Sequence, residues 1–192
     1  VFTKIEPFAQ YGFNKSHAAA YALIAYQTAF LKTYYKEDFI AATMSTELTN
    51  TSKLREFIEE LKKMNIEIVN PSINKCFSDF RAINGKLYYG LGAIKNVGFE
   101  AISNIVKERD KNGIFKSLND FIHRVDTKDV NKLQLEGLVK AGAFDEFDKD
   151  RNKIINSIPK IIQKIKNIND DKENHQTNLF ENEENIKEEF VF

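Results

Sequence analysis

The feature that most constrains the fold is the run AAAYALIAYQTAFLKTYY, from Ala18 to Tyr35, which is apolar on nearly every side of a helix. Alanine and leucine favour helix, and a helix that is apolar all round is normally buried. Asn14 and Ser16, just before the run, are good N-cap residues. The sequence therefore predicts a helix from His17 to Tyr35 that is surrounded by other parts of the protein.

The longest apolar stretch, Ala18 to Leu31, is interrupted by Gln27 and Thr28 and is shorter than the ~20 residues of a membrane span. No basic and then apolar leader opens the sequence. The single cysteine, Cys76, excludes an internal disulfide and a cysteine-cluster metal site. We therefore expect a cytoplasmic protein without membrane contact, and the start at Val1 suggests a fragment.

The rest of the chain predicts a mainly α fold with a small β-hairpin. Asn84-Gly85 is the dipeptide that best fits a type I′ turn between two short strands. The strands are expected at Ile66–Val69, Phe80–Ile83 and Lys86–Tyr89. Further helices are expected at Asp38–Leu48, from a cap at Thr51 or Ser52 to about Met64, and at Phe99–Arg109, Leu118–Val125, Val130–Lys140 and Arg151–Lys166.

The formal net charge of zero is an average over two unlike regions. Residues 1–166 hold 26 basic and 20 acidic side chains, whereas residues 167–192 hold 2 and 8. Only the first region is a candidate for binding phosphates, although its excess is also compatible with ordinary surface charge. The polar, acidic end predicts a flexible tail over 167–192.

The segment YGFNKSH places Asn14, Lys15, Ser16 and His17 at the expected start of the first helix. Free N–H groups and the helix dipole favour an anion there, and lysine and histidine add charge and donors. These four residues are candidates for binding a phosphate-bearing ligand. The alternative is a capped helix with incidental lysine and histidine.

The segment LGAIKNVG is followed by a helix and resembles a helix-hairpin-helix motif, whose exposed N–H groups bind a DNA phosphate without reading bases. Asn96 stands where the pattern usually has its first glycine, and asparagine tolerates a positive φ. Leu138–Phe144 is a candidate for a second, more degenerate hairpin. Each hairpin has a purely structural alternative. The candidate DNA-binding residues are Lys95, Asn96, Val97 and Gly98 in the first hairpin, and Lys140 and Gly142 in the second.

In the acidic tail, QTNLF resembles the peptide that docks bacterial polymerases onto the sliding clamp. Leu179 and Phe180 would be apolar anchors, and Gln176 would supply directed hydrogen bonds.

In order along the chain, YGFNKSHAAAYALIAYQTAFLKTYY, EDFIAATMSTE, NPSINKCFSDF, YYGLGAIKNVG and LVKAGAFD are similar to the C-family of bacterial replicative DNA polymerases. The resemblance implies the end of the fingers domain over 1–75, a β-hairpin and helix-hairpin-helix module over 76–166, and a tail with a clamp-binding motif over 167–192. The implied partners are incoming deoxynucleoside triphosphate, duplex primer-template DNA, the sliding clamp and other replicase subunits.

Polymerase chemistry needs clustered carboxylates that hold two Mg²⁺ ions, and the family places them in a palm domain upstream of the fingers. Asp170-Asp171 and Glu59-Glu60 are better explained as solvated charge. We therefore expect no catalytic residue, metal ligand or cofactor in this chain, Mg²⁺ only in the parent enzyme, and no activity of the isolated fragment.

Two other classes of protein remain open. A stand-alone DNA- or clamp-binding adaptor with a helix-hairpin-helix would have no use for the alanine-rich helix after FNKSH. A structural helical scaffold would not explain QTNLF.

Overall fold

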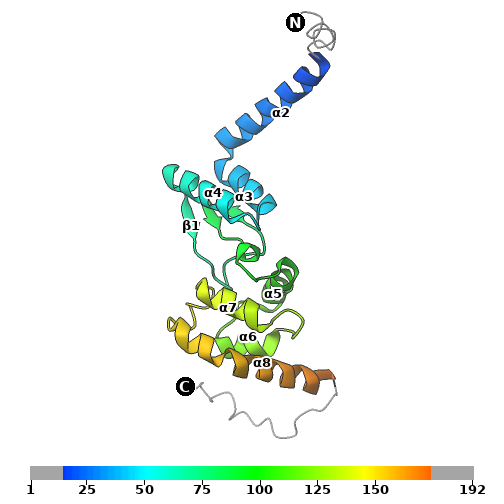
Figure 1. Cartoon of the computed structure of the whole chain (residues 1–192), viewed down its shortest axis with the longest axis vertical. Helices are drawn as coiled ribbons and strands as arrows, with labels where there is room; N and C mark the ends of the chain where they lie inside the picture. Colours follow the sequence, from blue (N-terminus) through cyan, green and yellow to red (C-terminus); the bar gives the residue numbers. More distant parts are fainter. Residues whose placement is uncertain (1–14, 174–192) are drawn as a thin grey trace, which may run out of the picture.

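The computed structural model describes residues 15–173, and the chain there is mainly helical with one small sheet (Figure 1). This confirms the predicted fold class. The helices are α2 (Lys15–Tyr34), α3 (Lys36–Thr46), α4 (Thr51–Lys63), α5 (Phe99–Asn112), α6 (Leu118–Arg124), α7 (Lys132–Lys140) and α8 (Arg151–Glu173), with a short 3-10 helix η1 (Leu91–Ala93). The strands are β1 (Glu67–Val69), β2 (Arg81–Ile83) and β3 (Lys86–Tyr88). Within the described range, none of these helices is both long and apolar enough to cross a membrane.

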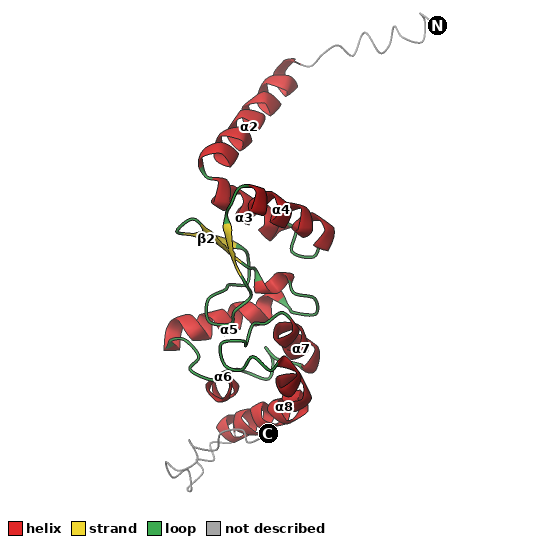
Figure 2. Ribbon diagram, turned by 90° about the vertical axis from the view of Figure 1, so that its left-hand side faces the viewer, coloured by secondary structure: helices red, strands yellow, loops and turns green. Residues whose placement is uncertain are grey.

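Helix α2 extends away from one end of the molecule in both views (Figures 1 and 2). The prediction of a helix here is confirmed, but the prediction that it is buried all round is wrong. None of its residues is buried, and Tyr34 is 68% exposed. Among the described residues its neighbours lie at its C-terminal end, where it packs on α3 and where Lys32 pairs with Glu60 of α4 at 2.6 Å. An apolar helix is stabilised when other residues bury it, but its own sequence does not determine whether such neighbours are present.

The first of two cores lies between α3, α4 and the sheet. Its buried side chains are Ile40, Ala41, Met44, Leu54, Leu61, Phe80 and Leu87. Ser45 fixes α3 to the sheet, because the backbone N–H of Phe80 donates to its hydroxyl at 3.1 Å. Helix α4 begins at Thr51, slightly earlier than expected, because its N-cap is Asn50 and not Thr51 or Ser52; the Asn50 side chain accepts from the N–H of Lys53.

The sheet has the order β1-β3-β2, so the predicted hairpin of β2 and β3 gains a third, parallel strand. The turn between β2 and β3 is as predicted, since Asn84 and Gly85 have φ values of 52° and 74°. Leu87 is fully buried in the middle strand, where it pairs with Ile68 of β1 and Ala82 of β2. The parallel pairing was not foreseen, because three residues carry too little periodicity to name a partner strand.

The second core is enclosed by α5, α6, α7 and α8 at the other end of the molecule (Figure 2). Phe115, Phe121 and Phe144 stack edge to face, with successive ring centroids 5.1 Å apart. Helix α8 covers this core with Ile154, Ile158, Ile161 and Ile165, which lie on one helical face.

Helix α8 is longer than predicted. It continues through Pro159 and ends at Glu173, whereas the sequence predicted an end at Lys166. Residues 167–173 are therefore helical, and the prediction of a flexible tail starting at residue 167 is wrong for them. Ile168 packs against the second core, so the apolar repeat of the helix extends into the polar segment.

The segment from Asn70 to Ser78 joins the two cores. Its carbonyl groups at Ile73 and Cys76 accept hydrogen bonds from Arg109 of α5, at 3.2 and 2.6 Å. Asn74 makes a two-way bridge to Phe115, accepting from its N–H and donating to its carbonyl, both at 2.9 Å. The segment is thus held to the second core by polar contacts from both Arg109 and Asn74.

Replacing Arg109 with methionine should lower the free energy of unfolding by about 3 kcal/mol, because two buried carbonyl groups lose their donor. Arg109 is only 5% exposed. Arg81 is a matched control, since it too stacks on Phe77 and pairs with a neighbouring aspartate but is exposed. Arg81→Met should change the stability by less than about 0.5 kcal/mol. Urea denaturation of both variants checks this, and equal losses would contradict it.

Candidate functional site

The first predicted hairpin is present between η1 and α5. The N–H of Val97 donates to the carbonyl of Ile94 at 3.0 Å, and Asn96 has a φ of 67°. Asparagine is thus in the positive-φ position where the motif usually has glycine, as predicted. Val97 is buried, while Lys95, Asn96 and Gly98 face solvent. The hairpin therefore combines an apolar anchor with an exposed polar turn.

Helix α5 begins directly after the hairpin, with Gly98 as its N-cap. The carbonyl of Gly98 accepts from the N–H of Ile102 at 3.1 Å, which starts the helix. The first N–H groups of any helix have no intrahelical acceptor. In the described part of the chain, no hydrogen bond occupies the N–H of Gly98 either. The turn and the helix start thus present backbone donors at an exposed position, and Lys95 in the same turn is also exposed.

Gly98 has a φ of −78°, which any residue adopts, so the second glycine of the hairpin is not needed for its backbone conformation. A Cβ placed there would lie 3.4 Å from the side-chain nitrogen Nε2 of Gln134. A larger side chain at this position would therefore obstruct the space around the donors rather than strain the chain.

Helix α7 packs against the hairpin at Gly137. This contact was not predicted from the sequence. A Cβ on Gly137 would lie 2.8 Å from the carbonyl oxygen of Lys95 and 3.1 Å from Cγ2 of Val97. The hairpin backbone therefore approaches α7 at a place where only glycine leaves room. The available signal was a glycine inside a helix, which disfavours the helix by about 1 kcal/mol relative to alanine and usually has a packing reason.

The second predicted hairpin is a helix end of the Schellman type. Gly142 has a φ of 87°, its N–H donates to Val139, and the N–H of Ala143 donates to Leu138, both at 2.9 Å. The N–H of Ala141 is used as well, by the carbonyl of Gly137. The backbone donors of this turn are thus engaged within the protein.

Arg151 closes the second turn. It donates to the carbonyl of Lys140 at 3.0 Å and to the carboxylate of Asp145 at 2.8 and 2.5 Å. The hydrogen bond from Arg151 lowers the pKa of Asp145, so this carboxylate stays negatively charged beside the turn. Lys140 itself pairs with Glu136. The structure therefore does not bring Lys140 and Gly142 into an open donor site.

The other predicted site residues lie elsewhere. Lys15, Ser16 and His17 form the exposed first turn of α2, at the far end of the molecule from α7 and α8 (Figure 1). The ring of His17 packs against Tyr21, with centroids 4.3 Å apart. Asn14, Gln176, Leu179 and Phe180 lie outside the described residues.

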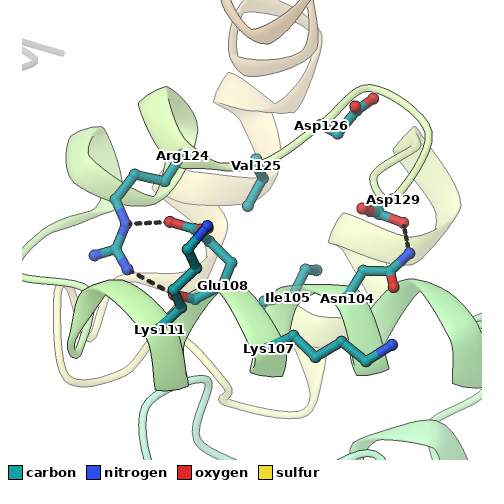
Figure 3. A pocket seen from close by; sticks show the side chains of 9 residues that line it. All are labelled: Asn104, Ile105, Lys107, Glu108, Lys111, Arg124, Val125, Asp126 and Asp129. Atoms are coloured by element: carbon teal, nitrogen blue, oxygen red, sulfur yellow. Dashed lines mark hydrogen bonds and ion pairs between the residues drawn. The ribbon is translucent and has the colours of Figure 1, made fainter.

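A groove of about 290 Å³ lies between α5 and the segment after α6 (Figure 3). Arg124 bonds Glu108 at 3.0 Å, and Asn104 bonds Asp129 at 2.8 Å. Partial burial works to raise the pKa of Glu108, but hydrogen bonds from Asn112 and Arg124 outweigh it and keep the pKa below its usual value. Three cationic and three anionic side chains line the groove, so it has no net charge to attract an ion.

Groups of three or more histidine, cysteine, aspartate or glutamate side chains that could hold a metal ion are absent from the described residues. The prediction that this chain has no metal site also concerns the residues outside 15–173, and it stays a prediction.

Comparison with known proteins first defines a class. The model of the helix-hairpin-helix motif matches residues 65–154, which include the hairpin, α5 and α7. The chain therefore contains a helix-hairpin-helix module.

The particular relatives are DNA polymerase III alpha subunits. Identity is 42% to that of Borreliella burgdorferi over 100% of the chain, 45% to that of Campylobacter jejuni over 94%, and 47% to that of Chlamydia trachomatis over 79%. The chain spans 17%, 15% and 12% of these relatives. It is homologous to a segment of DNA polymerase III subunit alpha, and the resemblance inferred from the sequence is confirmed.

The two hairpin glycines should respond differently to alanine. Gly142→Ala should lower the free energy of unfolding by about 1–2 kcal/mol, because a Cβ is disfavoured at its positive φ. At Gly98, alanine is a poorer N-cap, which destabilises the fold, but it also makes the unfolded chain less flexible, which stabilises the fold. Gly98→Ala should therefore change the free energy of unfolding by less than about 0.5 kcal/mol. Thermal unfolding of the two variants tests this; a larger loss at Gly98 would show that its backbone is strained.

Proposed function

We propose that the chain is part of a DNA-directed DNA polymerase that acts in chromosome replication, and that its helix-hairpin-helix module holds duplex primer-template DNA without reading its sequence. The observation that carries the proposal is the exposed donor surface formed by Lys95, Asn96, Gly98 and the start of α5, inside the matched motif. Backbone N–H groups at a helix start suit a phosphate and cannot distinguish bases.

A polymerase segment fits better than a stand-alone adaptor. The similarity to the alpha subunits extends over 94–100% of the chain in two relatives, and so includes the region of α2 that lies outside the motif. An exposed apolar helix such as α2 is also unusual for a small independent protein, because large exposed apolar surfaces mark contacts with other parts or partners.

The proposal assigns the second hairpin a structural role. Its backbone donors are bonded internally and Asp145 lies beside them. Only the first hairpin is therefore proposed to contact DNA phosphate.

The remaining roles rest on the resemblance. We assign Asn14, Lys15, Ser16 and His17 to the side of the incoming nucleotide, and Gln176, Leu179 and Phe180 to the sliding clamp. The catalytic carboxylates and Mg²⁺ would belong to another part of a cytoplasmic replicase. The isolated chain should accordingly be inactive in primer extension.

Duplex binding by the 192-residue chain should be weak, salt-sensitive and the same for unrelated sequences. Each phosphate contact made by a cation contributes about 0.9 to the log–log salt slope, so Lys95→Ala should reduce the slope by about that amount. Gly98→Val should weaken binding to all duplexes alike, because its side chain obstructs the donors. Fluorescence anisotropy over a salt series measures both effects. A variant that changed base preference would contradict a backbone-directed grip.

In a full-length parent enzyme, Lys15→Ala or His17→Ala should reduce nucleotide incorporation more than primer-template binding. A helix start with two added donors suits a triphosphate. Lys36 offers a matched control, since it is also an exposed lysine at the first position of a helix. Lys36→Ala should leave incorporation unchanged. Equal losses of incorporation and DNA binding in the Lys15 variant would indicate a folding defect instead.

A peptide covering Gln176 to Phe180 should bind a bacterial sliding clamp. Phe180→Ala should weaken binding by about 2 kcal/mol, roughly thirtyfold, because a buried aromatic anchor is lost. Thr177→Ala and Asn178→Ala should have little effect, since these residues act as spacers. Calorimetric titration of the clamp with each peptide measures these affinities. Equal binding by the Leu179→Ala, Phe180→Ala double variant and the natural peptide would contradict the assignment of a clamp-binding motif.

A further inference from the structure

The start of α7 lies beside the start of α5. The side-chain nitrogen Nε2 of Gln134 is 3.4 Å from the position that a Cβ on Gly98 would occupy. Gln134 is in the first turn of α7, and Gly98 is the N-cap of α5. A side-chain amide from a different helix therefore reaches the surface on which the backbone donors of the hairpin lie.

Hydrogen bonding fixes which end of the Gln134 amide faces this surface. Asn131 and Gln134 form a capping box: the N–H of Gln134 donates to Oδ1 of Asn131 at 2.9 Å, and the N–H of Asn131 donates to Oε1 of Gln134 at 3.0 Å. The second bond requires an acceptor, so it assigns the oxygen and leaves the NH₂ group toward Gly98. No hydrogen bond within residues 15–173 occupies that NH₂ group.

Gly137 keeps the hairpin at this distance. It lies three residues after Gln134, on the same side of α7. The carbonyl of Lys95 would be 2.8 Å from a Cβ at Gly137, so any side chain there would push the hairpin outward. The close approach at Gly137 thus holds the Gly98 donors and the Gln134 amide together.

We propose that Gln134 is a further phosphate-binding residue, and that Gly137 is a positioning residue that holds the hairpin within its reach. This rests on the proposed binding of duplex DNA by the first hairpin. A single phosphate would then accept hydrogen bonds from the start of α5 and from the Nε2 group of α7. The contact is neutral, so it adds affinity without a counterion-release contribution.

Matched variants separate this role from helix capping. Gln134→Met keeps the side-chain length and removes both the cap acceptor and the NH₂ donor. Asn131→Ala weakens the same capping box but leaves the donor in place. In anisotropy titrations of a mixed-sequence duplex with the 192-residue chain, Gln134→Met should bind about tenfold more weakly, because a hydrogen bond to a charged phosphate is lost. Asn131→Ala should bind within about twofold of the natural chain, since it loses only the cap.

Two further readouts exclude a structural effect. The salt slope of Gln134→Met should equal that of the natural chain, whereas Lys95→Ala should reduce it by about 0.9. Gln134→Glu keeps a cap acceptor and replaces the donor with a carboxylate, so it should fold normally by circular dichroism and bind DNA more weakly than Gln134→Met.

Gly137→Ala should improve the intrinsic helix propensity of α7, and yet it should reduce DNA affinity and speed hydrogen exchange of the amides at 95–98. Each outcome is decisive. If the natural chain binds no duplex at low salt, the proposed function fails and this inference with it. If the natural chain binds and Gln134→Met or Gln134→Glu binds equally well, only the role of Gln134 is overturned. Equal losses in Gln134→Met and Asn131→Ala would reduce that role to capping, and unchanged affinity in Gly137→Ala would remove the positioning role.

Discussion

The structure depends on Arg109, a buried cation in α5 that donates hydrogen bonds to the carbonyl groups of Ile73 and Cys76. Two carbonyl groups in a loop would otherwise face an apolar core, where unpaired acceptors are costly. A guanidinium group can satisfy both because its donors are fixed in a plane. The bonds also place the segment Asn70–Ser78 against the second core and so determine where the chain enters the sheet.

The same segment also binds the residues that precede the hairpin in the chain. The N–H groups of Leu91 and Gly92 donate to the carbonyls of Phe77 and Ser78 at 2.8 and 2.9 Å. A Cβ on Gly92 would lie 2.7 Å from the Ser78 oxygen, so the strand-like contact needs glycine there. The hairpin is thus held at two places: its preceding residues bond the segment Asn70–Ser78, and its backbone packs against α7 at Gly137. Backbone donors that are fixed on both sides lose little freedom when a phosphate binds, which favours binding by geometry rather than by charge.

The sequence was informative where the determinants are local. The hairpin turn at Asn84-Gly85, the positive φ of Asn96 and the existence of each described α-helix follow from neighbouring residues, and they are found as predicted. Contacts between distant segments were not predictable: the pairing of β1 with β3, the approach of Lys95 to Gly137, and the reach of Gln134 to Gly98. The exposure of α2 belongs to the same group, since burial depends on what surrounds a helix and not on its own composition.

Net charge was a poor guide to the site for a physical reason. Backbone N–H groups at the start of α5 and the amide of Gln134 carry no formal charge, and yet they are the donors that we propose for the phosphate. The groove along α5 shows the opposite case, in which three cationic and three anionic side chains cancel, and Arg124 and Glu108 pair with each other. A count of lysine and arginine would rank the groove above the hairpin. Charge balance and backbone donors reverse that order, because the three carboxylates of the groove oppose an anion, whereas the first N–H groups of α5 have no intrahelical acceptor.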